Sequence, residues 1–431
     1  MIIEHKVYGR GKIQKKRFGG FELYVEFEDG ISRWVRKDEV RVLTEIPILT
    51  KREPLKPVLP KEQFKARQII EALRLGIVPY DYVNKFTFGR EKEIERVIAW
   101  LNGQRGSLII TGEYGSGKSH FLEYLYSYAL KNNWAVSLVE LDPNEAPLHK
   151  PKVIYEKIIS SFKFKGNMDF REFLKQIAGS RDFYKLKYHE YLGRVIEEIR
   201  NGTDDEDTYN WIEGKPTWYH HPPMYGYSTC ANIYCYILSG IGWAARNILG
   251  MNGFLVLFDE AESVDPYWYS SYQNRKGWNF LTGLILMANN DERLLMDEVE
   301  ARYSWSGFSE GYWGKYTGLQ YCGYSQLPFI WRSPCYVKLI FTFTPVPWIL
   351  NRNPLNNVDK LELEHLSINS LQEMSRRISE LYEQAYGFRS TVKSILEFLP
   401  RDKTRLFIKG MVEALDLMRF HPDKSVEELL R

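Results

Sequence analysis

The sequence predicts an α/β fold in which helices flank a parallel β-sheet. Residues 108–111 and 254–258 are short apolar runs, which is typical of parallel strands buried on both faces. A glycine-rich stretch follows the first run and an acidic pair follows the second, at the strand ends where open α/β sheets bind ligands. From Ser367 onward the apolar residues recur at helical spacing, which predicts a C-terminal helical lid.

Composition limits the class of protein. The chain has 431 residues, a length that suggests two or three domains, and its formal net charge of +3 argues against a globally basic nucleic-acid binder. The 4 cysteines are too few for a disulfide scaffold and indicate a reducing setting. The first residues carry charges where a signal peptide needs an apolar core, and glycine and arginine interrupt the most apolar window, residues 233–248. We therefore expect a cytoplasmic protein that does not enter a membrane.

Residues 1–48 are predicted to form a small β-barrel. Short alternating apolar runs are separated by turn signals, of which Asp29-Gly30 is a typical tight hairpin. The pattern of residues 7–13 resembles the Tudor/SH3-like barrels attached to some helicases and transcription factors. The module also carries clustered cations, which form either a solvated hairpin or a docking surface for nucleic acid or a protein. These cations are Lys12, Lys15, Lys16 and Arg17.

The remaining chain divides into a linker, a core and a lid. Prolines among Lys, Arg and Glu predict a semi-rigid linker at residues 49–62. The α/β core is expected at residues 63–350 and the helical lid at residues 351–431. Within the core, residues 266–335 are rich in Tyr, Trp and Gly. Their rings could stack nucleic-acid bases, but few cations lie between them, so a structural insertion is the preferred interpretation.

The glycine-rich stretch matches the pattern G-x-x-x-x-G-K-[ST] between a predicted strand and a predicted helix. In such a loop, backbone N–H groups and the positive end of the following helix hold phosphate. Lys118 would contact the β- and γ-phosphates of a nucleotide, and the Ser119 hydroxyl would ligate Mg²⁺. An ordinary glycine-rich turn is the alternative, but the flanking strand and helix favour phosphate binding. The predicted P-loop residues are Gly112, Glu113, Tyr114, Gly115, Ser116, Gly117, Lys118, Ser119 and His120.

The acidic pair predicts hydrolytic chemistry at the end of the second apolar run. Asp259 would hold Mg²⁺, and Glu260 would polarise an attacking water, as in a Walker B element. An aspartate without the glutamate would instead suggest a site that only binds nucleotide. Residues 337–343 predict a further buried strand, at whose end Thr344 is expected to contact the γ-phosphate or the attacking water.

Several stretches together resemble the ATP-binding proteins of BREX-type phage-defence systems (BrxD-like). The similar stretches are residues 66–79, 88–91, 112–121, 139–149, 258–262 and 344–345. The family consists of P-loop ATPases of the AAA+/origin-recognition-like branch. The resemblance covers residues 63–431 with gaps in the aromatic-rich insertion, whereas the N-terminal barrel lies outside the family core.

The resemblance also implies roles for three arginines. Arg90, in the Gly-Arg-Glu element, corresponds to a residue beside the adenine. Arg405 corresponds to a lid arginine that reaches the nucleotide, although Thr404 stands where the family often has proline. Arg275 is similar to an arginine that could act between subunits of a homo-oligomer.

By this resemblance we expect an Mg-ATP-hydrolysing switch or motor that acts in antiphage defence with DNA or with a DNA-processing protein such as a helicase. Two alternatives remain. One is a signalling scaffold that holds its nucleotide with little turnover. The other is a helicase loader or anchor that docks through the N-terminal barrel.

Overall fold

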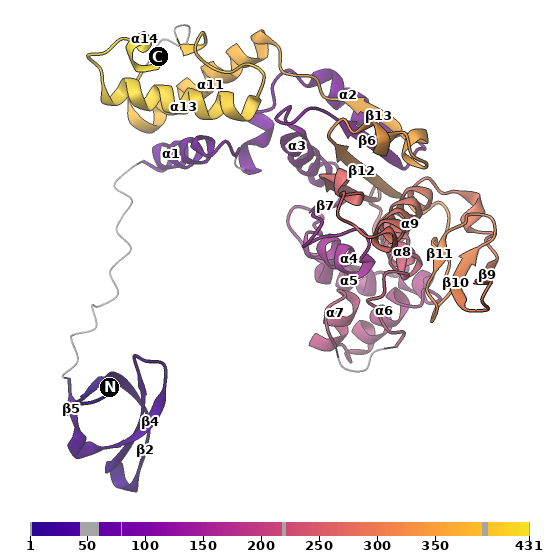
Figure 1. The fold of residues 1–431 in the computed structure, drawn as a ribbon, viewed down its shortest axis with the longest axis horizontal. Coiled ribbons are helices and arrows are strands. Elements are labelled where there is room, and N and C mark those ends of the chain that lie inside the picture. The colour runs from indigo at the N-terminus through magenta and orange to yellow at the C-terminus, as the bar shows by residue number, and fades with distance from the viewer. Residues whose placement is uncertain (1, 44–59, 79, 218–220, 390–394, 431) are drawn as a thin grey trace. The chain divides into compact units, whose positions relative to one another are not determined.

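The computed structural model describes residues 2–43, 60–78, 80–217, 221–389 and 395–430. The chain forms two compact units, residues 1–64 and 65–431, and each is described by itself (Figure 1). Most of the expected linker lies outside the described residues. Its last two positions, Lys61 and Glu62, begin helix α1 (Lys61–Arg74), so an ordered helix starts slightly earlier than the composition suggested.

The first unit is a five-stranded antiparallel sheet with strand order β4-β3-β2-β1-β5. Its strands are β1 (Ile2–His5), β2 (Gly9–Arg17), β3 (Glu22–Phe27), β4 (Ser32–Arg36) and β5 (Val40–Val42). One face buries a small apolar core made by Ile3, Leu23, Val25, Phe27 and Val35. The turn expected at Asp29-Gly30 joins β3 to β4, with Gly30 at a φ of 78° and the Asp29 carboxylate accepting the Ile31 N–H at 3.0 Å.

A five-stranded parallel sheet organises the second unit, with strand order β13-β6-β12-β8-β7. Its strands are β6 (Ser107–Thr111), β7 (Ala135–Glu140), β8 (Phe254–Asp259), β12 (Val337–Phe343) and β13 (Asp359–Glu362). Every residue of β8 and β12 is buried, because helices cover both faces of the sheet. The prediction of a parallel sheet flanked by helices is therefore confirmed.

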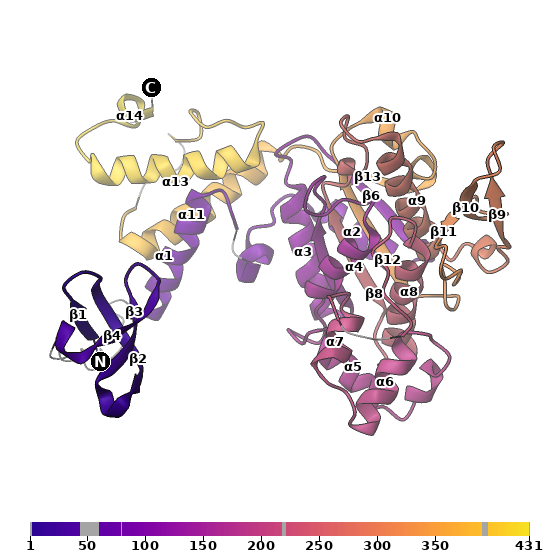
Figure 2. The same cartoon turned by 60° about the horizontal axis from the view of Figure 1, so that its bottom comes forward.

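The alternation of side chains along the strands divides the core between the two faces. Leu108 and Ile110 of β6 pack with helices α2 (Glu91–Leu101) and α3 (Lys118–Lys131), whereas Ile109 between them joins the cluster on the opposite face. That opposite face is covered by α4 (Pro151–Ser160), α8 (Ala231–Asn247) and α9 (Ser271–Ala288). Figure 2 shows α3 on one side of the sheet and α8 and α9 on the other.

The segments between these strands supply further helices and a small sheet. The additional helices are α5 (Phe170–Gly179), α6 (Leu192–Asn201), α7 (Glu206–Ile212) and α10 (Pro347–Leu350). The aromatic-rich insertion contains α9 and a three-stranded antiparallel sheet, β11-β10-β9. Its strands are β9 (Val299–Tyr303), β10 (Ser309–Gly314) and β11 (Gln320–Tyr321). In the described part of the chain no helix has both the length and the apolar character needed to cross a membrane.

Two features differ from the expected boundaries of core and lid. Strand β13 pairs with β6 and lies beyond residue 350, where the core was expected to end. It is a short edge strand in which only Leu361 is buried, so it lacks the apolar run that marks an inner strand. Helix α1, expected in the core, packs instead with α11 (Ile368–Tyr386) and α13 (Thr404–Phe420) in a separate apolar cluster.

The helical cluster that contains α1 is also held together by polar contacts. Arg74 of α1 forms an ion pair with Asp416 of α13, which also accepts the Tyr382 hydroxyl at 2.6 Å. The Arg67 guanidinium of α1 donates to the Ala385 carbonyl at 2.8 Å. The last helix, α14 (Val426–Leu430), contacts α13. This helical cluster, which contains the helices predicted as a lid, is therefore built from both ends of the second unit.

A buried histidine makes the stability of the second unit depend on pH. His189 is 1% exposed, and its Nδ1 accepts the N–H groups of Tyr191 and Leu192 at the start of α6. Its Nε2 has no hydrogen-bond partner among the described residues, and burial lowers the pKa of His189 to about 3. The fold therefore requires the neutral ring, and the stabilisation is complete above the unfolded-state pKa of about 6.5 and is lost as the pH falls towards 3.

We expect the free energy of unfolding to fall by about 2 kcal/mol between pH 7.5 and pH 5 because of His189. In this range the unfolded chain binds a proton on His189, whereas the folded chain does not. Denaturant unfolding at several pH values measures this slope. His189→Asn keeps an acceptor for the two N–H groups but cannot titrate, so this part of the slope should disappear in that variant. An identical slope in the variant would show that His189 is not the titrating group.

Candidate functional site

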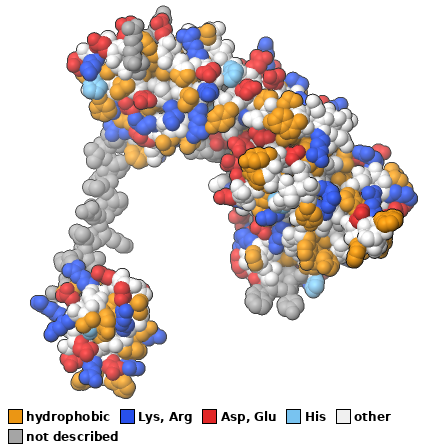
Figure 3. Space-filling model, in the orientation of Figure 1, with side chains coloured by type: hydrophobic (Ala, Val, Ile, Leu, Met, Phe, Trp, Pro, Cys, Tyr) orange, Lys and Arg blue, Asp and Glu red, His pale blue; other side chains and the backbone are white. Residues whose placement is uncertain are grey.

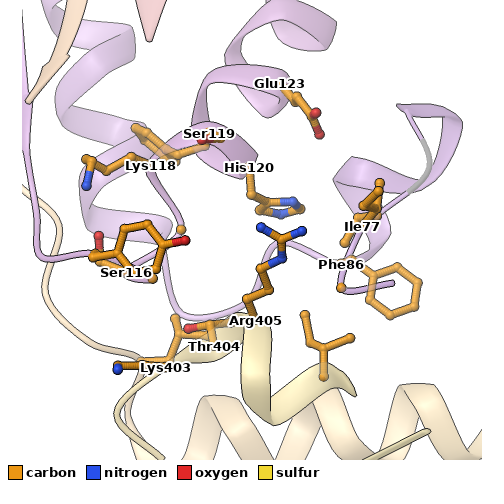
Figure 4. Close-up of a pocket in the computed structure, with 18 of the residues that line it drawn as sticks. Ile77, Phe86, Ser116, Lys118, Ser119, His120, Glu123, Lys403, Thr404 and Arg405 are labelled. Atoms are coloured by element: carbon orange, nitrogen blue, oxygen red, sulfur yellow. The ribbon is translucent and has the colours of Figure 1, made fainter. Parts of the chain in front are cut away.

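A cavity of about 830 Å³ lies where the parallel sheet meets the helical lid. The glycine-rich loop with the start of α3 forms one wall, and the ends of β8 and β12 contribute Asp259, Glu260, Glu262 and Thr344. The start of α13 and residues 76–78 and 86–88 complete it. Figure 4 shows Lys118, Ser119 and His120 of α3 on one side of the pocket and Lys403, Thr404 and Arg405 of α13 on the other.

The glycine-rich loop connects β6 to α3 in a conformation that requires glycine. Gly115 and Gly117 have φ angles of 87° and 95°, in the left-handed region that other residues rarely adopt. Gly117 is the N-cap of α3 and no side chain caps that helix end, so its first N–H groups remain available to an anion. An added Cβ on Gly112 would lie 2.5 Å from the Ser116 hydroxyl, so the loop leaves no room for a larger residue at this position.

Lys118 is the first residue of α3 and folds back over the loop. Its ammonium group donates to the carbonyls of Gly112 at 2.7 Å and Glu113 at 3.2 Å. Both acceptors are weak partners for a full charge, and a phosphate group would compete with them favourably. Gly112 and Glu113 themselves do not line the cavity, whereas the predicted residues from Tyr114 to His120 do.

The end of β8 presents two carboxylates to the cavity. Asp259 is nearly buried and accepts a hydrogen bond from the Thr342 hydroxyl, which itself accepts the Glu260 N–H at 3.1 Å. Glu260 has a φ of 55° and a ψ of 43°, a strained left-handed conformation for a residue other than glycine. Burial, and then the nearby charges of Asp259 and Glu262, raise the pKa of Glu260 above its usual range. The backbone strain and the repulsion between carboxylates therefore both act on Glu260, which lies beside the glycine-rich loop.

Thr344 was expected to face the γ-phosphate. In the structure it is hydrogen-bonded to Glu262, which was not among the predicted site residues. Its hydroxyl donates to Glu262 at 2.8 Å and its N–H to the same oxygen at 3.3 Å. The residue that contacts Asp259 is instead Thr342, which is fully buried within β12. A hydroxyl buried within a strand needs a hydrogen-bond partner, so the position of Thr342 near the end of the predicted strand was the signal that could have identified it.

The lid contributes cations to the cavity. Arg405, an exposed residue in the first turn of α13, makes no hydrogen bond or ion pair with any residue that the structure describes, and it points towards the cavity (Figure 4). Lys403 is the N-cap of α13 and approaches the loop, since an added Cβ on Gly115 would lie 3.5 Å from its side chain. Lys403 was not predicted, because only the fold brings the start of α13 to the glycine-rich loop.

Arg90 was expected beside an adenine. In the structure its guanidinium group links three segments of the second unit. It is 6% exposed and donates to the carbonyls of Ser116 at 2.8 Å and Glu364 at 2.7 Å. It also pairs with Glu93 at 2.8 Å. Arg90 therefore joins the glycine-rich loop to the chain that follows β13 and to α2, although it still lines the cavity.

The far end of the cavity is apolar and suits a flat, uncharged group. Ile77, Phe86 and Met374 line it together with His120. The His120 ring lies 3.0 Å from the Thr87 hydroxyl, and burial, with a contribution from the Arg90 charge, lowers the pKa of His120 to about 4. The imidazole is therefore neutral near pH 7, which fits a binding surface for a base rather than for a phosphate.

The donor set of the cavity fits Mg²⁺ bound together with a phosphorylated ligand. Ser119 and Asp259 offer the hydroxyl and carboxylate oxygens that this ion prefers. The described residues contain no group of three or more His, Cys, Asp or Glu side chains that could hold a metal by themselves. Mg²⁺ bound with a phosphorylated ligand commonly takes one or two protein ligands, with waters and substrate phosphates as the others.

Arg275, expected to act between subunits, does not join this cavity. It is exposed on α9 and is absent from the residues that line the site. The cavity of this chain therefore contains every predicted catalytic residue except Arg275.

Residues 62–174 match the model of the family BREX system ATP-binding protein BrxC/D. The matched stretch contains all of α1 except its first residue, together with α2, the glycine-rich loop, α3 and β7, and hence Arg90, Lys118 and Ser119. It ends before the carboxylates of β8 and before the lid cations. No curated protein matches the chain. The comparison thus connects the loop side of the cavity to an ATP-binding family of phage defence.

Proposed function

We propose that this chain is an AAA+-like P-loop ATPase that binds and hydrolyses Mg-ATP as a switch or motor in phage defence. The observation that carries the proposal is a single cavity that places Lys118, Glu260 and Arg405 around a glycine-rich loop. The match of residues 62–174 to the BrxC/D family supports ATP as the nucleotide.

In this proposal the phosphates lie on the loop and the base lies at the apolar end. Backbone N–H groups of the loop and of the first turn of α3 donate to the phosphate oxygens. Lys118 exchanges its two carbonyl acceptors for the β- and γ-phosphates, and Arg405 approaches from the lid. Ser119 and Asp259 would hold Mg²⁺, which neutralises phosphate charge.

Glu260 is the group that activates water. Its carboxylate accepts a hydrogen bond from the water whose oxygen attacks the γ-phosphorus, and the bond to the ADP oxygen breaks. Its raised pKa makes it a better proton acceptor than an ordinary glutamate. Thr344 follows β12 at the same edge of the sheet, and its hydroxyl would exchange the Glu262 carboxylate for a γ-phosphate oxygen as its acceptor.

The nucleotide would touch both the sheet and the helical cluster of α1, α11 and α13, so its exchange can change how the two pack. This is the physical basis for a switch. The exposed position of Arg275 away from its own cavity is compatible with a role towards a neighbouring copy in a homo-oligomer. DNA or a DNA-processing protein such as a helicase is the proposed partner.

The test is an equilibrium titration of the intact chain with ATP and Mg²⁺, followed by measurement of phosphate release with and without DNA. We expect saturable binding and many turnovers for each chain. Tight binding with no more than one turnover would favour the signalling scaffold over the ATPase. A chain that binds neither ATP nor ADP would refute the proposal.

Arg90→Lys tests whether the fixed shape of the loop matters for binding. A lysine ammonium cannot reach the Ser116 carbonyl, the Glu364 carbonyl and Glu93 together, and each buried acceptor left unpaired costs about 1–3 kcal/mol. We expect a lower unfolding temperature and about tenfold weaker ATP binding by calorimetry. The matched control is Arg96→Lys, since Arg96 is exposed and its one hydrogen bond within the described part of the chain is to the Lys360 carbonyl. Equal effects of both exchanges would contradict the role of Arg90.

A further inference from the structure

The outer face of the N-terminal sheet carries an ordered array of side chains that the ATPase proposal does not use. Because side chains alternate along a strand, residues opposite to the buried Leu23, Val25 and Val35 point outward. A register shift between Ile13 and Lys15 changes which residues of β2 point outward. As a result, cations of β2 lie beside the outward residues of β3 and β4.

The strand register arranges these residues in three rows across β2, β3 and β4. The middle row is Lys15, Tyr24 and Trp34. The two flanking rows are Arg17, Glu22 and Arg36, and Lys12, Glu26 and Ser32. We call these nine residues the outer face.

Two aromatic rings occupy the centre of the outer face. The Tyr24 and Trp34 ring centroids are 5.1 Å apart, and Trp34 is 39% exposed. The Arg17 guanidinium lies over Trp34, 4.1 Å from its centroid. Neither ring belongs to the apolar core of the unit, so their burial does not explain their presence. The exposed Trp34 ring, the partly buried Tyr24 ring beside it and the guanidinium group together offer a stacking platform.

The charges around the rings favour an anionic partner. The outer face has four cations, Lys12, Lys15, Arg17 and Arg36, against two carboxylates. Glu22 is paired with Arg17, and Glu26 accepts the Gln14 amide at 2.7 Å, so both carboxylates are engaged. Lys12 and Lys15 form no ion pair with any described residue. In Figure 3 the visible face of this unit shows Lys and Arg side chains next to hydrophobic ones.

We propose that the outer face binds single-stranded nucleic acid. Single strands expose the flat faces of their bases, which stack on aromatic side chains, while cations beside the rings contact the backbone phosphates. A duplex hides its base faces, so it could use the cations but not Trp34 and Tyr24. The proposal goes beyond ATP hydrolysis and does not depend on it.

The test uses the full chain and a fluorescein-labelled oligothymidylate of ~20 nucleotides, long enough for one binding site, with anisotropy as the readout at about 50 mM salt. Trp34→Ala is expected to weaken binding about tenfold or more, since stacking contributes ~1–3 kcal/mol per base. Trp34→Phe keeps a ring and should retain most of the affinity. Lys15→Gln should make the dependence of log affinity on log salt shallower by about 0.7.

Two control variants on the same unit lie off the outer face. Val7→Ala removes an exposed apolar side chain from the turn between β1 and β2, and Lys37→Gln removes an exposed cation that follows β4. Neither should change the affinity for the oligonucleotide by more than a small factor. All these variants should keep the wild-type affinity for ATP, which separates this surface from the nucleotide site.

Three outcomes would overturn the proposal. They are no detectable binding of the oligonucleotide at low salt, binding that Trp34→Ala leaves intact, or binding of a duplex at least as tight as that of the single strand. If Trp34→Ala does not fold, Tyr24→Leu and Lys15→Gln carry the same test. Weaker binding by Tyr24→Leu together with a shallower salt dependence in Lys15→Gln would support the outer face, and wild-type behaviour of either variant would refute it.

Discussion

Lys118→Ala is expected to weaken ATP binding by about tenfold to a hundredfold, the scale of a lost hydrogen bond between charged groups, without unfolding the chain. Among the residues that the structure describes, the ammonium group of Lys118 donates to two loop carbonyls, and its removal leaves the apolar clusters on both faces of the sheet intact. Calorimetric titration with Mg-ATP measures the loss, and thermal unfolding without nucleotide checks the fold.

Lys131→Ala is the matched control for this prediction. Lys131 lies in the last turn of the same helix, away from the cavity, so its exchange should change neither binding nor the fold. Unchanged ATP affinity in Lys118→Ala would remove the basis for treating the glycine-rich loop as a phosphate site.

The second large effect is expected on catalysis. Glu260→Gln keeps the size of the side chain but cannot accept a proton from water, so hydrolysis should fall by ~10²-fold or more. ATP binding should persist, and the ATP-bound form should accumulate. Single-turnover phosphate release and equilibrium binding, measured on the same preparation, separate the two effects.

The pH dependence of this reaction gives an independent check. Because the pKa of Glu260 is raised, the wild-type rate should fall on the acid side at a higher pH than an ordinary glutamate would give, and this limb should vanish in Glu260→Gln. Glu140→Gln is the control, since Glu140 is a nearby acid that only adds to the field at Glu260. It should leave the rate within a few-fold of wild type. Wild-type hydrolysis by Glu260→Gln would make the tight-binding scaffold the better interpretation.

Local sequence patterns predicted the framework of the molecule well. The inner strands β8 and β12 could be predicted from the sequence, because both faces of a parallel strand are buried and the strand is therefore a run of mainly apolar residues. The edge strand β13 was not visible, since its single buried residue, Leu361, gives no pattern. The apolar residues of helix α1 recur along one face, but this pattern does not indicate which helices that face will contact.

The site was predictable where its chemistry is local and unpredictable where it depends on distant contacts. Lys118 lies in the loop-to-helix segment that follows β6, and Asp259 and Glu260 lie at the end of β8, so the pattern alone predicted a common edge, and the structure brings them to one cavity. The function of Arg90 depends on Glu364, far along the chain, and that of Lys403 depends on the packing of α13 against the loop. Such contacts are properties of the tertiary fold and leave no trace in local spacing.

The membership of α1 in the helical cluster has a mechanical consequence. The chain leaves the first unit and enters the second at α1, which is bound to α11 and α13 by the apolar cluster and by the pair of Arg74 with Asp416. If nucleotide exchange turns that cluster against the parallel sheet, as in the proposed switch, the start of α1 moves with the cluster because α1 is packed into it. The point at which the chain enters the second unit would then belong to the moving half of the switch and not to the sheet.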